Sequence, residues 1–229
     1  MLPIAQVYLR DVPMPCLPGP GNLLQVLWCP FDHDPAKPEP KTKVIWRPDT
    51  EIDDVPGKVP EPAAAKHPRY VPQPCVLHPE QITEYPNYLD LSKDLKDMVR
   101  RWCGEQATGT GPGSFYTVDP KVFYWDELST APGWKIGGWP RWGLTDPIPL
   151  QCSACGDIMV PLLTIDSLEW DTSTRSWIPF EDQERAAAPT VIGAPDPGRP
   201  TMLVIHDLNC LQLYACQTSP GHPHAELVQ

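Results

Sequence analysis

The chain has 229 residues, of which 18 are Lys or Arg and 29 are Asp or Glu; its formal net charge of -11 argues against a nucleic-acid-binding protein, because phosphate contacts require clustered basic side chains. No run of the sequence approaches the roughly 18 consecutive apolar residues of a membrane span. The 32 prolines far exceed the usual roughly 5% and predict long proline-rich loops between a few short regular elements, because proline interrupts helices and central strands.

The first half of the chain carries three predicted strands and a long loop. Apolar residues 23–29 predict a buried strand, and residues 43–47 predict its neighbour. Residues 48–74 contain seven prolines and predict a loop along the surface. Residues 81–85 alternate between apolar and polar character, which is typical of a further strand.

A helix is predicted next, because five apolar residues recur at helical spacing. These residues are Leu91, Leu95, Met98, Val99 and Trp102. Their offsets place them on one face of a helix. Asp90 is the predicted cap at its start, and Gly104 is the predicted end.

The second half of the chain is predicted to be mainly strands. The apolar segments are residues 121–125, 159–165, 202–205 and 211–216. Residues 181–200, which are rich in charge, alanine and proline, predict another loop. These elements indicate an α+β protein with few helices, folded as a single domain over residues 1–229.

An internal similarity offers an alternative organisation. Residues 24–29, with His33 beyond them, resemble residues 211–216, with His222 beyond them. This similarity predicts a diverged duplication, with two closely packed halves at about residues 1–105 and 115–229. The alternative is chance, because short apolar strands often resemble one another.

The cysteines predict a metal site. Cys152 and Cys155 form a CxxC pair followed by glycine, a spacing that lets two thiolates converge on one tetrahedral ion. With Cys216 and His222 they make a predicted set of four ligands for a structural zinc, with no open position for a substrate. His224 is the alternative fourth ligand, since the sequence does not decide which of the two imidazoles points inward.

Other cysteines are interpreted differently. Cys210 lies six residues before Cys216, in register with the predicted strand, and is expected in the core. A second set of potential ligands is Cys29, His33, Cys75 and His78. Neither of its pairs has standard metal-ligand spacing, so ordinary loop hydrogen bonds are the favoured interpretation. The N-terminal segment has no basic leader or long apolar core, which predicts a cytoplasmic protein with reduced thiols.

Three tryptophans, Trp134, Trp139 and Trp142, lie in a segment with two adjacent glycines. A packed turn is one interpretation, because glycine allows backbone conformations that other residues resist. The other is an exposed surface that binds a partner, with Trp139 and Trp142 as anchors, because tryptophan is favoured at interfaces. No catalytic motif was found, although an enzyme with a pocket near residues 134–142 remains an alternative.

The segments at residues 135–140, 149–150, 162–166 and 211–216 together resemble the YwqG-like family of bacterial proteins of unknown function. That family is similar in turn to the C-terminal part of the programmed-cell-death-protein-two family. The resemblance covers residues 133–216 and implies strongly bent, internally repeated β-sheets. It carries no catalytic residues, and the cysteine pair is a departure from the family's common pattern.

The resemblance and the acidic charge together predict a non-enzymatic protein that binds another protein. Some relatives are suspected immunity proteins, so a basic partner such as a bacterial toxin domain is the leading expectation, with opposite charge assisting the encounter. Solubility alone also explains such a charge. A structural or chaperone-like adaptor is the third interpretation.

Overall fold

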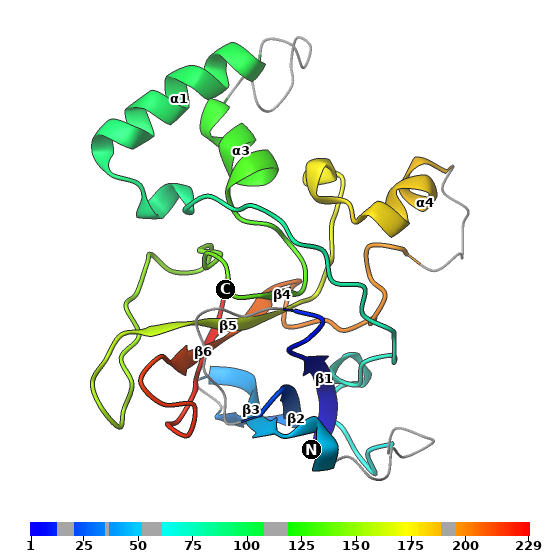
Figure 1. Ribbon diagram of the computed structural model, residues 1–229. Coiled ribbons are helices and arrows are strands. Elements are labelled where there is room, and N and C mark those ends of the chain that lie inside the picture. The colour runs from blue at the N-terminus through cyan, green and yellow to red at the C-terminus, as the bar shows by residue number, and fades with distance from the viewer. Residues whose placement is uncertain (13–20, 35–36, 52–60, 108–118, 189–195) are drawn as a thin grey trace.

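The computed structural model describes residues 1–12, 21–34, 37–51, 61–107, 119–188 and 196–229 (Figure 1). One antiparallel sheet has the order β1-β2-β3, with strands at Leu2–Tyr8, Leu23–Asp34 and Lys37–Arg47. The other has the order β4-β5-β6-β7, with strands at Lys135–Ile136, Met159–Asp166, Cys210–Cys216 and Ala225–Val228. The protein is therefore a mixed α+β fold dominated by open sheets, as predicted.

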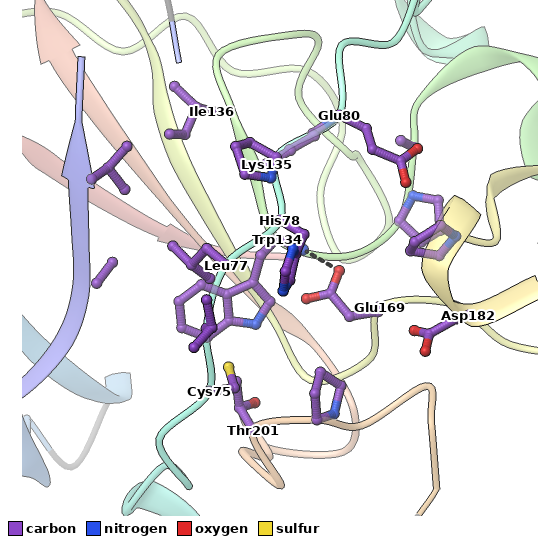
Figure 2. A pocket seen from close by; sticks show the side chains of 18 of the residues that line it. Cys75, Leu77, His78, Glu80, Trp134, Lys135, Ile136, Glu169, Asp182 and Thr201 are labelled. Carbon is purple, nitrogen blue, oxygen red and sulfur yellow. Dashed lines mark hydrogen bonds between the residues drawn. The ribbon is translucent and has the colours of Figure 1, made fainter. Parts of the chain in front are cut away.

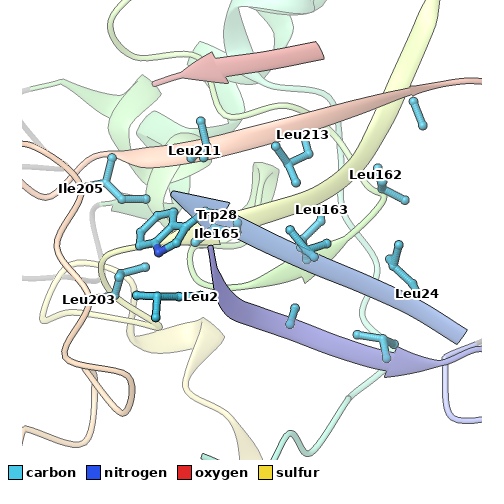
Figure 3. Packing of buried hydrophobic residues seen from close by; sticks show 14 of the residues in the cluster. Leu2, Leu24, Trp28, Leu162, Leu163, Ile165, Leu203, Ile205, Leu211 and Leu213 are labelled. Atoms are coloured by element: carbon cyan, nitrogen blue, oxygen red, sulfur yellow. The ribbon is translucent and has the colours of Figure 1, made fainter. Parts of the chain in front are cut away.

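Apolar side chains from both sheets form one core. Figure 3 shows Trp28 of β2 near Ile165 of β5 and Leu211 of β6, and all three side chains are fully buried. All seven residues of β6 are buried, which explains why its sequence is apolar apart from Gln212. The predicted strands at residues 23–29, 43–47, 159–165 and 211–216 are confirmed.

The two similar segments occupy comparable places. β2 lies between β1 and β3, and β6 lies between β5 and β7. Each segment is thus an inner strand, and inner strands share an apolar character whatever their origin. Internal duplication and the division into two halves therefore stay predictions.

Three predicted strands are wrong. Residues 81–85 pair with no strand among the described residues. Residues 121–125 lie largely in the helix α3, Pro120–Tyr124, because Pro120 is well placed in a first helical turn and a short apolar run also suits a buried helix. Residues 202–205 make only an isolated bridge, Ile205 to Asn209, and Met202 has a positive φ of 53° that interrupts extended backbone.

The helix predicted from its apolar spacing is present as α1, Lys93–Ala107. It begins after Ser92, whose hydroxyl accepts a hydrogen bond from the Leu95 N–H at 3.3 Å, so the cap is not Asp90. It continues beyond Gly104. Leu91 and Val99 pack towards Tyr88, Cys103 and Tyr124 of a small second core. The other three predicted apolar residues, Leu95, Met98 and Trp102, are exposed.

The remaining helices are short. A π-helical turn, Trp125–Ser129, continues α3, and α4 spans Gln183–Ala187 inside the predicted loop of residues 181–200. Single 3-10 turns occur at Asp49–Glu51, Pro68–Tyr70, Tyr88–Asp90, Arg175–Trp177 and Phe180–Asp182. Figure 1 shows α1 and α3 side by side at one end of the molecule, away from β1, β2 and β3. In the described part of the chain, no helix has the length and apolar character needed to cross a bilayer.

Candidate metal centre and acidic cleft

The CxxC segment forms a tight turn at the start of β5. The Cys152 N–H donates to the Asp157 carbonyl at 2.8 Å, and the Gly156 N–H donates to the Cys152 carbonyl at 2.8 Å. Gly156 has a φ of 80°, a conformation that glycine adopts without strain. Met159, immediately after this turn, pairs with Cys216 at the end of β6. The antiparallel pairing of β5 and β6 therefore brings the turn to Cys216.

The structure brings the four predicted ligands together. Their ligand atoms all lie within 4.8 Å of one another. The Cys155 and Cys216 sulfurs are 3.5 Å apart, and His222 Nδ1 lies 3.6 Å from the Cys152 sulfur and 3.4 Å from that of Cys216. Tetrahedral ligands with metal–sulfur bonds of about 2.3 Å stand about 3.8 Å apart. The Cys3His group can therefore hold a metal ion with little rearrangement.

Two thiols of this group, those of Cys216 and Cys155, differ in pKa. Burial opposes ionisation of Cys216, but hydrogen bonds from the Ser219 backbone N–H and from His222 outweigh burial and lower its pKa to about 6. For Cys155, the Asp157 backbone N–H favours the thiolate, yet burial and hydrogen bonds to neighbouring thiols raise the pKa to about 11. A metal ion would bind the thiolate forms and release the remaining protons.

His222, and not His224, belongs to the group. His224 Nε2 lies 2.8 Å from the Thr42 hydroxyl on β3, and that hydroxyl donates to Glu226 at 2.6 Å. Lys41 pairs with the same carboxylate at 2.9 Å. Burial opposes ionisation of Glu226, but these hydrogen bonds, led by that from His224, lower its pKa to about 2. His224 therefore joins the two sheets where β3 meets β7.

The second set of potential ligands does not assemble. Among the described residues, the Cys3His group alone brings three or more Cys, His, Asp or Glu ligand atoms together. Cys29, His33, Cys75 and His78 are therefore not a metal site in this fold. Cys210 is buried in the core, as predicted, and burial raises its pKa to about 11.

The tryptophan segment is a packed turn built around buried carboxylates. Glu84 accepts hydrogen bonds from the Lys135 ammonium at 2.6 Å, the Ala131 N–H at 2.7 Å and the Trp139 N–H at 2.8 Å. The Glu84 and Lys135 side chains are only 6% and 8% exposed. Gly138 has a φ of 75° and lies directly against the Glu84 carboxylate. This ion pair therefore requires glycine at position 138.

Asp166 secures the other side of the turn. Its carboxylate accepts a hydrogen bond from Arg141 at 2.6 Å and from the Gly133 N–H at 3.2 Å. The Trp134 indole donates to the Asp166 carbonyl at 2.9 Å, and the Trp134 backbone N–H donates to Glu169 at 3.2 Å. Sequence analysis missed Glu84, Asp166 and Glu169, because no motif links these acids to the turn.

The two predicted anchors differ in exposure. Trp139 is 41% exposed, so its ring is available to a partner. Trp142 is only 5% exposed, and its indole donates to Asp90 at 2.9 Å. The expectation that Trp142 is a surface anchor is therefore wrong, because its ring is used to hold the segment before α1.

A large cleft of about 2490 Å³ lies beside this turn. It is lined by β1, by an extended segment around Cys75 and Glu80, and by the turn that carries Trp134 and Trp139. Figure 2 shows Glu169 beside Trp134, and the segment that carries Cys75, Leu77 and His78 passing through the same space. The predicted pocket near the tryptophan turn is thus present.

Acidic side chains outnumber basic ones in the cleft, where eight Asp or Glu residues and three Lys or Arg residues line the wall. Each basic residue already has an acidic partner: Lys135 pairs with Glu84, Arg185 with Asp182 and Arg199 with Asp196. Among the described residues, four of the other acids form no ion pair: Glu61, Glu80, Glu169 and Glu181. The cleft therefore carries an uncompensated negative charge.

Glu169 is the most perturbed of these acids. Burial raises its pKa to about 7, outweighing the hydrogen bond from the Trp134 N–H, and the charges of Asp166 and Asp182 raise it further. Burial and the charge of Glu169 in turn raise the pKa of Cys75. The Cys75 thiol is therefore protonated at neutral pH, which disfavours its use as a nucleophile.

We expect Glu169→Gln to stabilise the protein at pH 8 by about 2–3 kcal/mol and to change little near pH 4. The folded state holds the Glu169 proton up to a pKa of about 7, whereas the unfolded chain loses it near 4.5. The free energy of unfolding of the wild type therefore falls as pH rises through this window, whereas that of the variant does not.

Urea denaturation of both proteins from pH 4 to 8 measures the effect. Glu184→Gln, at an exposed position of α4, is the matched control. A gap between Glu169→Gln and the wild type that stays constant with pH would show that Glu169 titrates normally.

No family model, curated protein or solved structure matches this chain.

Proposed function

We propose that the protein is a non-enzymatic, zinc-stabilised binding protein for a basic protein partner, of which a bacterial toxin domain is the leading example. The cleft is the observation that supports a basic partner. Every Lys and Arg that lines it is paired with an acid of the chain, and further acidic side chains there form no ion pair among the described residues. The net charge of -11 extends the same field over the whole chain. The resemblance to YwqG-like proteins remains part of this proposal.

Zinc is the metal that we assign to the Cys3His group. Three thiolates and one imidazole are a ligand set typical of structural zinc, and four protein ligands leave no position for a substrate. Free thiols also suit a reducing compartment such as the cytoplasm, where we place the protein. Elemental analysis of protein purified without a chelator tests the assignment, with an expected content of about one zinc per chain.

Binding should be assisted by charge and prolonged by an apolar anchor. We expect the association rate with a purified basic partner to fall steeply as salt rises, because screening shortens the reach of opposite fields to about 10 Å at 0.1 M ionic strength. Trp139→Ala should speed dissociation with little effect on association, since Trp139 is exposed at the cleft.

Surface plasmon resonance across a series of salt concentrations measures the association and dissociation rates. Leu144→Ala is the control for Trp139→Ala, because Leu144 is 61% exposed and does not line the cleft. An association rate that does not depend on salt would contradict electrostatic assistance. An unchanged dissociation rate of Trp139→Ala would show that Trp139 is not an anchor.

A second candidate function is an enzyme that uses the same cleft. The observation in its favour is Glu169, whose pKa of about 7 suits a general base at neutral pH. The Glu169→Gln variant separates the two functions. It would abolish turnover by an enzyme, whereas a binding protein would keep its partner.

A further inference from the structure

β1 is an edge strand in the order β1-β2-β3. Among the residues that the structure describes, it pairs with β2 and with no other strand. Within the described part of the chain, no backbone hydrogen bond joins residues 2–7 to any segment except β2. An uncovered edge of this kind offers a row of N–H and C=O groups to another strand.

This edge opens into the acidic cleft. All seven consecutive residues of β1, Leu2–Tyr8, line the cleft. A strand that turned one face to the cleft would contribute only alternate residues, because side chains alternate between the two faces. The continuous lining therefore indicates that the edge of β1, with its backbone groups, borders the open space.

The extended segment of residues 74–84 also lines the cleft. It is held at its ends, where the Gln73 N–H donates to the Thr201 carbonyl at 2.8 Å and the Tyr85 N–H donates to the Ser129 carbonyl at 2.8 Å. Between these two bonds, the backbone of residues 74–84 forms no hydrogen bond with the backbone of any other described residue. Val76, 79% exposed, and Leu77, 46% exposed, leave apolar surface uncovered there.

We propose that an extended cationic segment of the partner adds to β1 as a new edge strand inside the cleft. The proposal rests on the proposed function and deepens it, because it names how the basic partner is recognised. Backbone hydrogen bonds to β1 supply the alignment. Basic side chains meet Glu80 and Glu181, which have no ion pair among the described residues, and the intervening side chains pack on the apolar surface.

The ladder identifies one backbone N–H for a direct test. The Leu9 N–H donates to the Asn22 carbonyl at 2.9 Å, so Leu9 turns its backbone groups towards the neighbouring strand. Successive residues alternate, which turns Tyr8 and Gln6 outward. The Tyr8 carbonyl accepts from the N–H of Asp11, a residue outside β1 and β2. The Gln6 N–H is therefore expected to face the cleft.

The probe is a fluorescent peptide of roughly ten residues in which lysine alternates with valine, long enough to pair with all seven residues of β1. Gln6→Pro removes the outward N–H at an edge position where proline is tolerated. Gln6→Ala keeps that N–H, and both variants lose the hydrogen bond from the Gln25 side chain to Gln6. We expect Gln6→Pro to weaken peptide binding about five- to tenfold and Gln6→Ala to change it less than about twofold. Melting temperatures establish that both variants fold.

Peptide chemistry gives a second measurement that does not depend on a protein variant. Two versions carry N-methyl groups on one or the other set of alternate residues. A strand uses one set of N–H groups towards its neighbour, so only one version should lose binding. Equal binding of both versions, or equal effects of Gln6→Pro and Gln6→Ala, would overturn strand addition.

Charge variants separate this inference from the proposed function. Glu80→Gln with Glu181→Gln should weaken binding of the lysine peptide, whereas the exposed pair Asp94→Asn with Glu184→Gln, outside the cleft, removes the same charge and should not. If the Glu80→Gln, Glu181→Gln variant binds the lysine peptide more weakly but Gln6→Pro binds it normally, the proposal of a basic partner stands and strand addition is rejected. Equal binding of a glutamate–valine peptide would reject both. No binding of the lysine peptide would reject strand addition, and association with the whole partner would then still test the proposed function.

Discussion

Loss of the metal is expected to lower the melting temperature by about 8–16 °C. Apparent zinc-binding free energies in small structural sites are about 10–16 kcal/mol, which is as large as the whole stability of a typical domain. If only about 4 kcal/mol of this reaches the folding equilibrium, a domain of this size loses about 8–16 °C. The double variant Cys152→Ser, Cys155→Ser and chelation of the wild type should both show the decrease in thermal denaturation.

The histidines and the remaining thiols provide matched controls. His222→Ala should lose metal and stability, whereas His224→Ala should keep about one zinc, because His224 contacts Thr42 instead of the thiols. Cys75→Ser should also keep it, since Cys75 is not a member of the Cys3His group. Full zinc content in the double cysteine variant would contradict the site.

Gly138→Val is expected to destabilise the fold by more than about 3 kcal/mol. Gly138 has a φ of 75°, and a Cβ there would lie 2.2 Å from the Glu84 carboxylate. The Glu84 carboxylate would have to move away from Lys135, which would break their ion pair and leave two unpaired buried charges. Chemical denaturation of the variant and the wild type measures the loss.

Gly137 separates this clash from backbone strain alone. It has a φ of 66°, yet a Cβ there would meet no atom within 4 Å. Gly137→Val should therefore cost only the strain of a left-handed conformation, about 1–2 kcal/mol. Equal losses in the two variants would show that the contact with Glu84 does not matter.

The sequence by itself determined the features that depend on neighbouring residues. A CxxC spacing followed by Gly156 already specifies a turn with two converging thiols. The apolar runs in β2, β5 and β6 identify buried strands, because strands that build a core carry apolar residues at most positions. The spacing of residues 91–102 identified α1, although the same pattern did not reveal that part of its apolar face is exposed.

Only the tertiary structure decided the features whose partners are distant in the chain. His222 and His224 are two residues apart and chemically identical, and the meeting of β3 with β7 commits His224 to Thr42. Residues 81–85 look like a strand, but a strand needs a partner, and Glu84 is instead committed to Lys135 across 51 positions. Glu169 likewise acquires its raised pKa from burial beside Trp134, a property of the folded cleft that no local spacing encodes.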